Sequence, residues 1–279
     1  MKNLGRGSRA LLVAGLVMVA GASASAGIFT LQDGNSSARF NTDALASGSR
    51  VGMDRWFVDG VNHMYSQWFW FRTDGDTQER RINSLPELAS GTSDTNFNGQ
   101  DETLFLRYGN MGDYTIETTF GLQGGSVGSG TADITEQIRI TNHGSAPRTF
   151  SFFQYCDFDL NNDINDDFVG VVNPNAVRQM DFLSGTTVSE TVLTPTFTLS
   201  EVNIYPTTLL KLDNGAVDNL DGSMGPLVGR RDYTWAFQWD FILGPGDSFL
   251  ISKDKQITPT PGTLALLGLG GLACARRRR

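Results

Sequence analysis

Apolar and polar residues alternate along most of the chain between residues 27 and 258. Residues 235–241 place four aromatic side chains on one face and small or polar side chains on the other, and residues 114–120, 133–141 and 248–252 alternate in the same way. A period of two is typical of a β-strand with one buried face. The pattern therefore predicts an all-β domain.

Residues 68–71 carry aromatic side chains at every position, which predicts a central strand that is buried on both faces. Glycine- and asparagine-rich turns, such as residues 33–35 and 142–144, separate the alternating segments. We expect one helical turn near residues 83–89. Because no proline- or serine-rich linker divides residues 27–258, we expect a single large antiparallel β-sandwich made of two sheets.

The first residues have the composition of a targeting segment. Three basic residues precede an apolar run over residues 10–20, and Ala24 and Ala26 offer small side chains for cleavage before Gly27. We therefore expect a signal peptide over residues 1–26, a helical segment that signal peptidase removes during export.

The last residues form a second targeting segment, residues 259–279. A Pro-Thr-Pro sequence precedes twelve apolar residues, and four arginines follow them. As a helix, these twelve residues cover about 18 Å, less than the ~30 Å hydrocarbon core of a bilayer. The arginines stay on the cytoplasmic side by the positive-inside rule. We expect a short transmembrane helix that holds the exported domain at the membrane transiently; a simple tail anchor is the alternative.

This C-terminal segment resembles the PEP-CTERM sorting signal, which exosortase-type membrane proteases recognise. The residues that carry the resemblance are Pro259, Thr260, Pro261, Arg276, Arg277, Arg278 and Arg279. The usual signal has Glu between the prolines, whereas this chain has Thr260. The resemblance implies an exosortase-type processing enzyme as a partner.

The domain itself is similar to uncharacterised exported proteins that carry such signals. The similarity lies in residues 56–60, 67–72, 153–160 and 235–240. It implies no activity and no catalytic residues. By its size, the domain is also similar to the β-supersandwich of galactose-mutarotase-like proteins, which is a likeness of fold and not of site.

Charge and residue counts exclude several classes of function. The formal net charge is −8, and the two targeting segments are basic, so residues 27–258 are more acidic still. Such a surface repels nucleic acid. Cys156 has no partner cysteine within the domain, so we expect a buried apolar residue there. With two histidines in the chain, neither a histidine-rich metal site nor a Ser–His triad is expected, and we predict a non-enzymatic protein.

An acidic segment follows the alternating residues 150–158. Asp157 and Asp159 would share one face of a strand, about 6.5–7 Å apart. Carboxylates at this density suit Ca²⁺, which binds hard oxygen ligands. The candidate ligands are Asp157, Asp159, Asp163, Asp166 and Asp167. A solvated acidic loop is the alternative.

A second acidic segment spans residues 94–102. Asp94, Asn96 and Asn98 match positions 1, 3 and 5 of a calcium loop, and glycine follows at position 6. Position 12, which requires a bidentate Glu, is Phe105. The spacing therefore favours a plain Asn-Gly turn over a cation site.

Two functions remain open from the sequence. We expect an exported β-sandwich at the cell surface or in the extracellular matrix with a structural or adhesive role. The alternative is a carbohydrate-binding or carbohydrate-active β-sandwich that acts on envelope or matrix polysaccharide. Paired Asp157 and Asp159 are near the separation of glycosidase carboxylates, and four tryptophans could stack on sugar rings or instead form the core. These tryptophans are Trp68, Trp70, Trp235 and Trp239.

Overall fold

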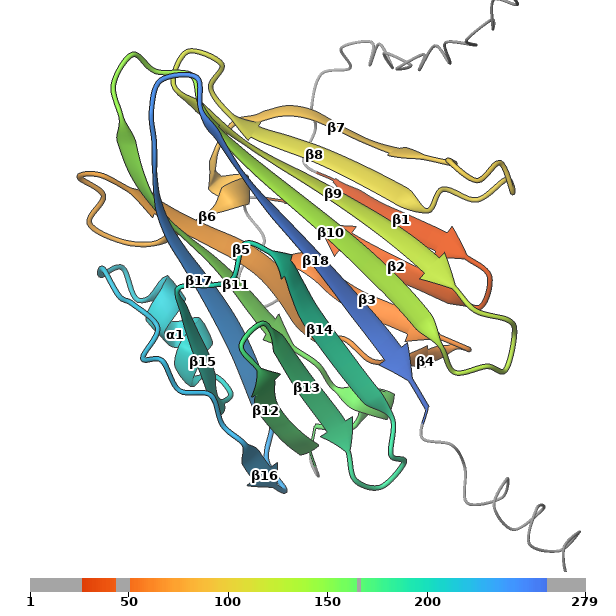
Figure 1. Ribbon diagram of the computed structural model, residues 1–279. Helices are drawn as coiled ribbons and strands as arrows, with labels where there is room; N and C mark the ends of the chain where they lie inside the picture. Colours follow the sequence, from red (N-terminus) through yellow and green to blue (C-terminus); the bar gives the residue numbers. More distant parts are fainter. Residues whose placement is uncertain (1–26, 44–50, 165–166, 260–279) are drawn as a thin grey trace, which may run out of the picture.

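The computed structural model describes residues 27–43, 51–164 and 167–259 (Figure 1). These residues form two nine-stranded sheets that pack face to face. The predicted signal segment and the residues after Pro259 lie outside the described part of the chain. Within the described residues, no helix has the length and apolar character to cross a bilayer.

The first sheet, called sheet A, runs in the order β1-β2-β3-β5-β11-β17-β15, with two short strands paired at its side. Its strands are β1 (Ile28–Asp33), β2 (Ser36–Asn41), β3 (Gly52–Val58), β4 (Val61–Asn62), β5 (Ser66–Thr73), β6 (Arg80–Arg81), β11 (Arg148–Asp157), β15 (Leu199–Ile204) and β17 (Tyr233–Leu243). All neighbours pair antiparallel.

The second sheet, called sheet B, runs in the order β16-β12-β13-β14-β18-β10-β9-β8-β7. Its strands are β7 (Glu87–Ser93), β8 (Thr103–Gly109), β9 (Tyr114–Gly124), β10 (Ala132–Asn142), β12 (Asp167–Asn173), β13 (Ala176–Asp181), β14 (Thr187–Thr194), β16 (Leu227–Gly229) and β18 (Ser248–Thr258). These neighbours are also antiparallel, so the predicted two-sheet sandwich is confirmed.

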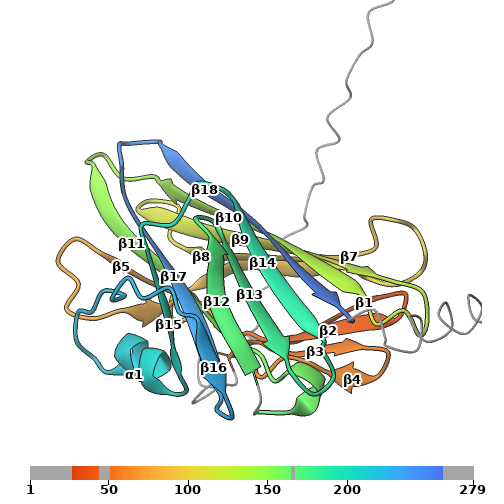
Figure 2. The same cartoon turned by 60° about the horizontal axis from the view of Figure 1, so that its bottom comes forward.

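Strand β5 is buried on both faces, as its aromatic sequence predicts. Phe69 faces sheet B, where its ring stacks on Phe120 of β9 at 6.1 Å. The alternate side chains Trp68 and Trp70 lie on the outer face of sheet A and donate hydrogen bonds to Asn83 and Asp213. Helix α1 (Thr207–Asp213) lies over this outer face (Figure 2), and the short 3₁₀ turn η2 (Ile82–Ser84) supplies Asn83 to Trp68.

Helical structure differs from the expectation in two places. The turn predicted near residues 83–89 is the 3₁₀ turn η2, and residues from Glu87 onward belong to β7 instead. Helix α1 has no counterpart in the sequence prediction, because its seven residues are too few to show a helical period. Tertiary packing maintains it: Leu209 and Leu212 are buried on the outer face of sheet A.

Four charged side chains lie between the sheets, where apolar residues are the rule. Glu136 of β10, Glu190 of β14, and Lys253 and Lys255 of β18 are all buried. Lys253 Nζ lies 2.6 Å from Glu136 and 3.1 Å from Glu190, and Lys255 Nζ lies 3.0 Å from Glu190 and also pairs with Glu136. We call these four residues the buried quartet. Each charged group in it pairs with two groups of opposite charge, and such pairing is what allows ions to be tolerated in a core.

Candidate functional site

Three carboxylates converge where β11 ends and β17 begins. Asp157 is the last residue of β11 and pairs with Thr234 of β17, so Asp232, just before β17, comes beside it. Asp159 follows β11 by two residues. One oxygen from each of the three carboxylates lies within 4.8 Å of the others, an arrangement that can hold a metal ion. We call Asp157, Asp159 and Asp232 the carboxylate cluster.

Asp157 is fully buried, and one of its oxygens has no partner among the residues that the structure describes. Tyr155 donates a hydrogen bond from its hydroxyl to Asp157 Oδ2 at 3.0 Å. Asp157 Oδ1 is buried and accepts no hydrogen bond from any described residue. Burial, followed by the charges of Asp232 and Asp159, raises the pKa of Asp157 well above its usual range. A buried acceptor of this kind is costly unless a proton or a cation satisfies it.

The pKa values of the two neighbouring carboxyl groups, Asp159 and Asp232, are raised as well. Burial, with the charges of Asp232 and Asp163 added, raises the pKa of Asp159 to about 7. Burial raises the pKa of Asp232 to about 6. Near neutral pH the carboxylate cluster therefore retains protons that ordinary carboxyl groups have lost, because several negative charges cannot gather in a poorly solvated space.

The other predicted ligands lie around this cluster. Asp163 directly follows the 3₁₀ turn η3 (Leu160–Asn162), and its charge acts on Asp159. Asp167 begins β12 in sheet B and accepts a hydrogen bond from Gln179 at 2.6 Å. Burial raises the pKa of Asp167 to about 8, against the opposing effect of that hydrogen bond. Asp166 lies outside the described residues.

The sequence therefore locates part of the cluster and misses Asp232. Its carboxylate comes from a strand that is remote in sequence, and only the pairing of β11 with β17 brings it close. Asp157 and Asp159 were predicted to share one face of a strand. Only Asp157 belongs to a strand, because β11 ends at this residue and Asp159 lies beyond it.

A pocket of about 160 Å³ lies against the cluster, and Asp159 lines it. The remaining lining residues are Arg39, Asp54, Arg55, Asn62, Met64, Tyr65 and Asn162. Arg39 Nε donates to Asp54 Oδ1 at 2.8 Å, so this pair fixes one wall of the pocket. The pocket thus offers hydrogen-bond donors, acceptors and one half-buried aromatic ring.

The tryptophans do not contribute to this pocket. Trp68, Trp70, Trp235 and Trp239 are each at most 2% exposed, which places all four in the packed interior. Stacking of these rings on sugars is therefore excluded, and the core alternative holds. The expectation for Cys156 is confirmed as well: it is fully buried, and burial raises the pKa of its thiol.

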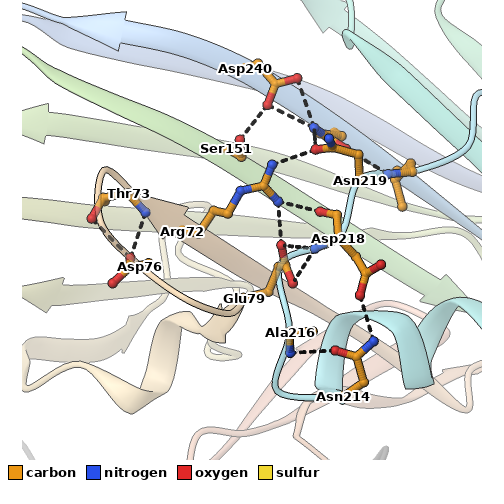
Figure 3. Close-up of polar contacts among 12 residues, drawn as sticks. Arg72, Thr73, Asp76, Glu79, Ser151, Asn214, Ala216, Asp218, Asn219 and Asp240 are labelled. Carbon is orange, nitrogen blue, oxygen red and sulfur yellow. Dashed lines mark hydrogen bonds and ion pairs between the residues drawn. The ribbon is translucent and has the colours of Figure 1, made fainter.

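A second polar region covers the outer face of sheet A (Figure 3). Arg72 of β5 donates to Glu79, to the carbonyl oxygen of Asp218 and to Asn219. Glu79 in turn accepts a hydrogen bond from the backbone N–H of Asp218 at 3.0 Å. These contacts fasten the segment between α1 and β16 onto the sheet, which indicates a structural role.

Comparisons with known proteins show the fold of the chain. No family model matches the sequence, and no curated protein matches it. A bacterial glucoamylase in complex with acarbose superimposes with a TM-score of 0.52 and 11% identity over 92% of this chain and 36% of that chain. A galactose mutarotase related enzyme from Lactobacillus acidophilus gives 0.51 and 7% over 84% of this chain and 97% of that chain. The chain spans little more than a third of the glucoamylase but nearly all of the mutarotase-related enzyme, and it shares the large two-sheet β-sandwich fold with both.

Proposed function

We propose that the protein is an exported carbohydrate-binding β-sandwich that binds saccharide in the pocket beside the carboxylate cluster. The observation that carries the proposal is the position of Asp159, which belongs both to the cluster and to the lining of the pocket. A divalent cation held by the cluster would therefore lie next to any ligand in the pocket.

Calcium chemistry fits these residues. Ca²⁺ takes six to eight oxygen ligands, and three aspartates can supply part of that number. Hydroxyl groups of a saccharide or water would supply the remainder. The unpartnered oxygen of Asp157 supports the proposal, because a cation would satisfy it without a hydrogen-bond donor.

The pocket has the side chains that saccharide recognition uses. Asn162 and Arg39 can hydrogen-bond to hydroxyl groups, and the ring of Tyr65 can contact an apolar sugar face. The fold of the solved structures gives additional support, since one is a glucoamylase bound to acarbose and the other is related to galactose mutarotase. Envelope or matrix polysaccharide is the corresponding partner of an exported protein.

Binding is favoured over catalysis by the burial of Asp157. Glycoside hydrolysis needs two carboxyl groups that flank the scissile bond. Asp157 is fully buried, whereas Asp159 lines the pocket. The pair predicted from the sequence therefore does not present two carboxyl groups to one substrate.

The test is calorimetric titration of the purified protein with soluble envelope polysaccharides, in Ca²⁺ and in EDTA. We expect binding that requires Ca²⁺ and that Asp159→Asn weakens at least tenfold. The matched control is Asp113→Asn, because Asp113 pairs with Arg148 and is absent from the pocket lining. Polysaccharide binding that neither EDTA nor Asp159→Asn affects would refute this assignment.

Export and sorting form the second part of the proposal. The signal segment 1–26 and the PEP-CTERM-like residues 259–279 support delivery to the cell surface or extracellular matrix, where a structural or adhesive role is compatible with polysaccharide binding. Intact-mass measurement of the exported protein should show a new N-terminus at Gly27 and loss of residues after about Pro261. A mass that retains Arg279 would contradict processing by an exosortase-type enzyme.

A further inference from the structure

The loop of residues 94–102 joins β7 to β8 (Figure 1), and several of its side-chain oxygens accept hydrogen bonds from its own backbone. Asp94 accepts hydrogen bonds from the backbone N–H groups of Asn98, at 3.1 Å, and Gly99, at 2.8 Å. Asn96 Oδ1 accepts from Asn98 N, and Asn98 Oδ1 accepts from Gln100 N. Gly99 has a φ of +87°, which L-residues rarely adopt. The side chains at positions 1, 3 and 5 therefore turn toward the inside of the loop.

Glu102 supplies the carboxylate that the sequence spacing lacks. Position 12 of the pattern, Phe105, belongs to β8, but Glu102 at position 9 folds back onto the loop. Its Oε1 accepts hydrogen bonds from the backbone N–H of Thr95, at 2.7 Å, and from the Thr95 hydroxyl. Glu102 is only 6% exposed, and its Oε2 is buried with no hydrogen-bond partner among the described residues.

Asp33 orients the two amide side chains of the loop. Its Oδ1 accepts hydrogen bonds from the side-chain nitrogens of Asn96, at 3.3 Å, and Asn98, at 2.8 Å. Its other oxygen accepts from the backbone N–H of Gly124 at 2.8 Å, so Asp33 is itself fixed. Because Asp33 holds the amide nitrogens, the amide oxygens face the loop backbone, where each accepts one N–H and keeps a second lone pair.

We propose that residues 94–102 form a Ca²⁺ site. Its ligands are the side chains of Asp94, Asn96, Asn98 and Glu102, with the backbone carbonyl of Gln100 at position 7. Carboxylate, amide and carbonyl oxygens are the donors that Ca²⁺ prefers, and waters complete its six to eight ligands. The cation would satisfy the buried Oε2 of Glu102, to which no residue in the described part of the chain donates a hydrogen bond.

The charge of the site sets its affinity. Two carboxylates and neutral oxygens resemble the calcium sites of extracellular modules, which bind with a Kd of about 10⁻⁴–10⁻³ M. Such a site is filled outside a cell and would join the β7–β8 loop to the end of β1 through Asp33. The site is separate from the carboxylate cluster and does not depend on the proposed saccharide binding.

The test is calorimetric titration of the full chain with Ca²⁺ alone. Glu102→Gln keeps the size and the Thr95 contact while removing the charge, and we expect it to weaken one class of Ca²⁺ site at least tenfold. Asp101→Asn is the matched control: it makes the same change one residue away, where the side chain is exposed and bonded to Thr92. Ca²⁺ affinity and stoichiometry in Glu102→Gln that equal those of the wild type would overturn the proposal.

Two further variants separate this site from the carboxylate cluster and from effects on folding. Asp159→Asn should leave the loop site intact, so the two proposals can fail independently. Asn96→Ala changes an exposed side chain and should weaken the same class of site several-fold while the circular dichroism spectrum stays unchanged. If Asn96→Ala binds Ca²⁺ as the wild type does, the ligand assignment is wrong even where Glu102→Gln fails to fold.

Discussion

The stability of the metal-free protein should fall as pH rises from 5 to 8, because poorly solvated carboxyl groups in and around the carboxylate cluster must lose protons. The pKa values of Asp232, Asp159 and Asp167 are about 6, 7 and 8 in the folded protein, against about 3.9 for an unfolded Asp. At any pH between the unfolded pKa and a group's folded pKa, the folded state binds more protons than the unfolded state. Stability is therefore lost as pH rises from about 4 through the folded pKa values, and the loss levels off above about 8.

Asp167 sets the scale of this loss, because its side chain is almost fully buried. A group titrating between its unfolded and folded pKa values changes the unfolding free energy by about 1.4 kcal/mol per pH unit. From pH 5 to 7, Asp167 alone would therefore cost at most about 3 kcal/mol. Solvent access to Asp159 and Asp232, and coupling among the groups, reduce what each adds, so we expect about 1–3 kcal/mol for the whole set.

Urea unfolding at pH 5, 6, 7 and 8, in EDTA and in Ca²⁺, measures this effect. In EDTA the unfolding free energy should fall with pH, and Asp167→Asn should reduce the slope. Ca²⁺ should restore stability most at pH 8, because cation binding favours the deprotonated carboxylates. A stability that is constant or rises from pH 5 to 8 in EDTA would refute the reasoning.

Two substitutions, each with a matched control, test the packing of the sandwich. Glu190→Gln leaves the two lysines of the buried quartet with one carboxylate and should cost about 3–5 kcal/mol in urea unfolding, whereas Glu117→Gln, in a half-exposed pair, should cost at most about 1 kcal/mol. Equal losses in the two variants would contradict the role of the quartet. Gly52→Ala would place Cβ 2.3 Å from the carbonyl oxygen of Gln67 at a φ of +86°, and should cost more than about 1 kcal/mol by thermal unfolding. Gly60→Ala shares the positive φ without the clash, so a similar loss there would mean that φ alone is responsible.

The sheets could be predicted because their signal is local. Alternation in residues 133–141 places Ile134 and Ile138 on one face, and the structure buries both. Glu136 has the same parity and points into the core with them, a position that was not predicted from the sequence for a charged residue. Its two lysine partners were not predicted either, since they lie on β18, whose predicted extent stops at residue 252.

The candidate sites depend on contacts that local patterns do not contain. Asp157 and Asp159 stand together in the sequence, but Asp232 joins them only through the register of β11 on β17. Glu102 was passed over because a fixed twelve-residue spacing assigns the final carboxylate to Phe105. The conformation of the loop places the nearer acid Glu102 against Thr95. Strand pairing therefore supplies the carboxylate missed in the first case, and the conformation of the loop supplies it in the second.

The buried quartet also specifies the register of β18 within sheet B. Strand β18 inserts between β14 and β10, and a slip of one residue would turn Lys253 and Lys255 outward and Asp254 inward. Three acids would then lie in the interior without their lysine counterions, so the cost of burying unpaired charge disfavours the shifted register. Because Glu136 and Glu190 both find their counterions on β18, a chain without residues 248–258 would leave two acids unpaired between the sheets.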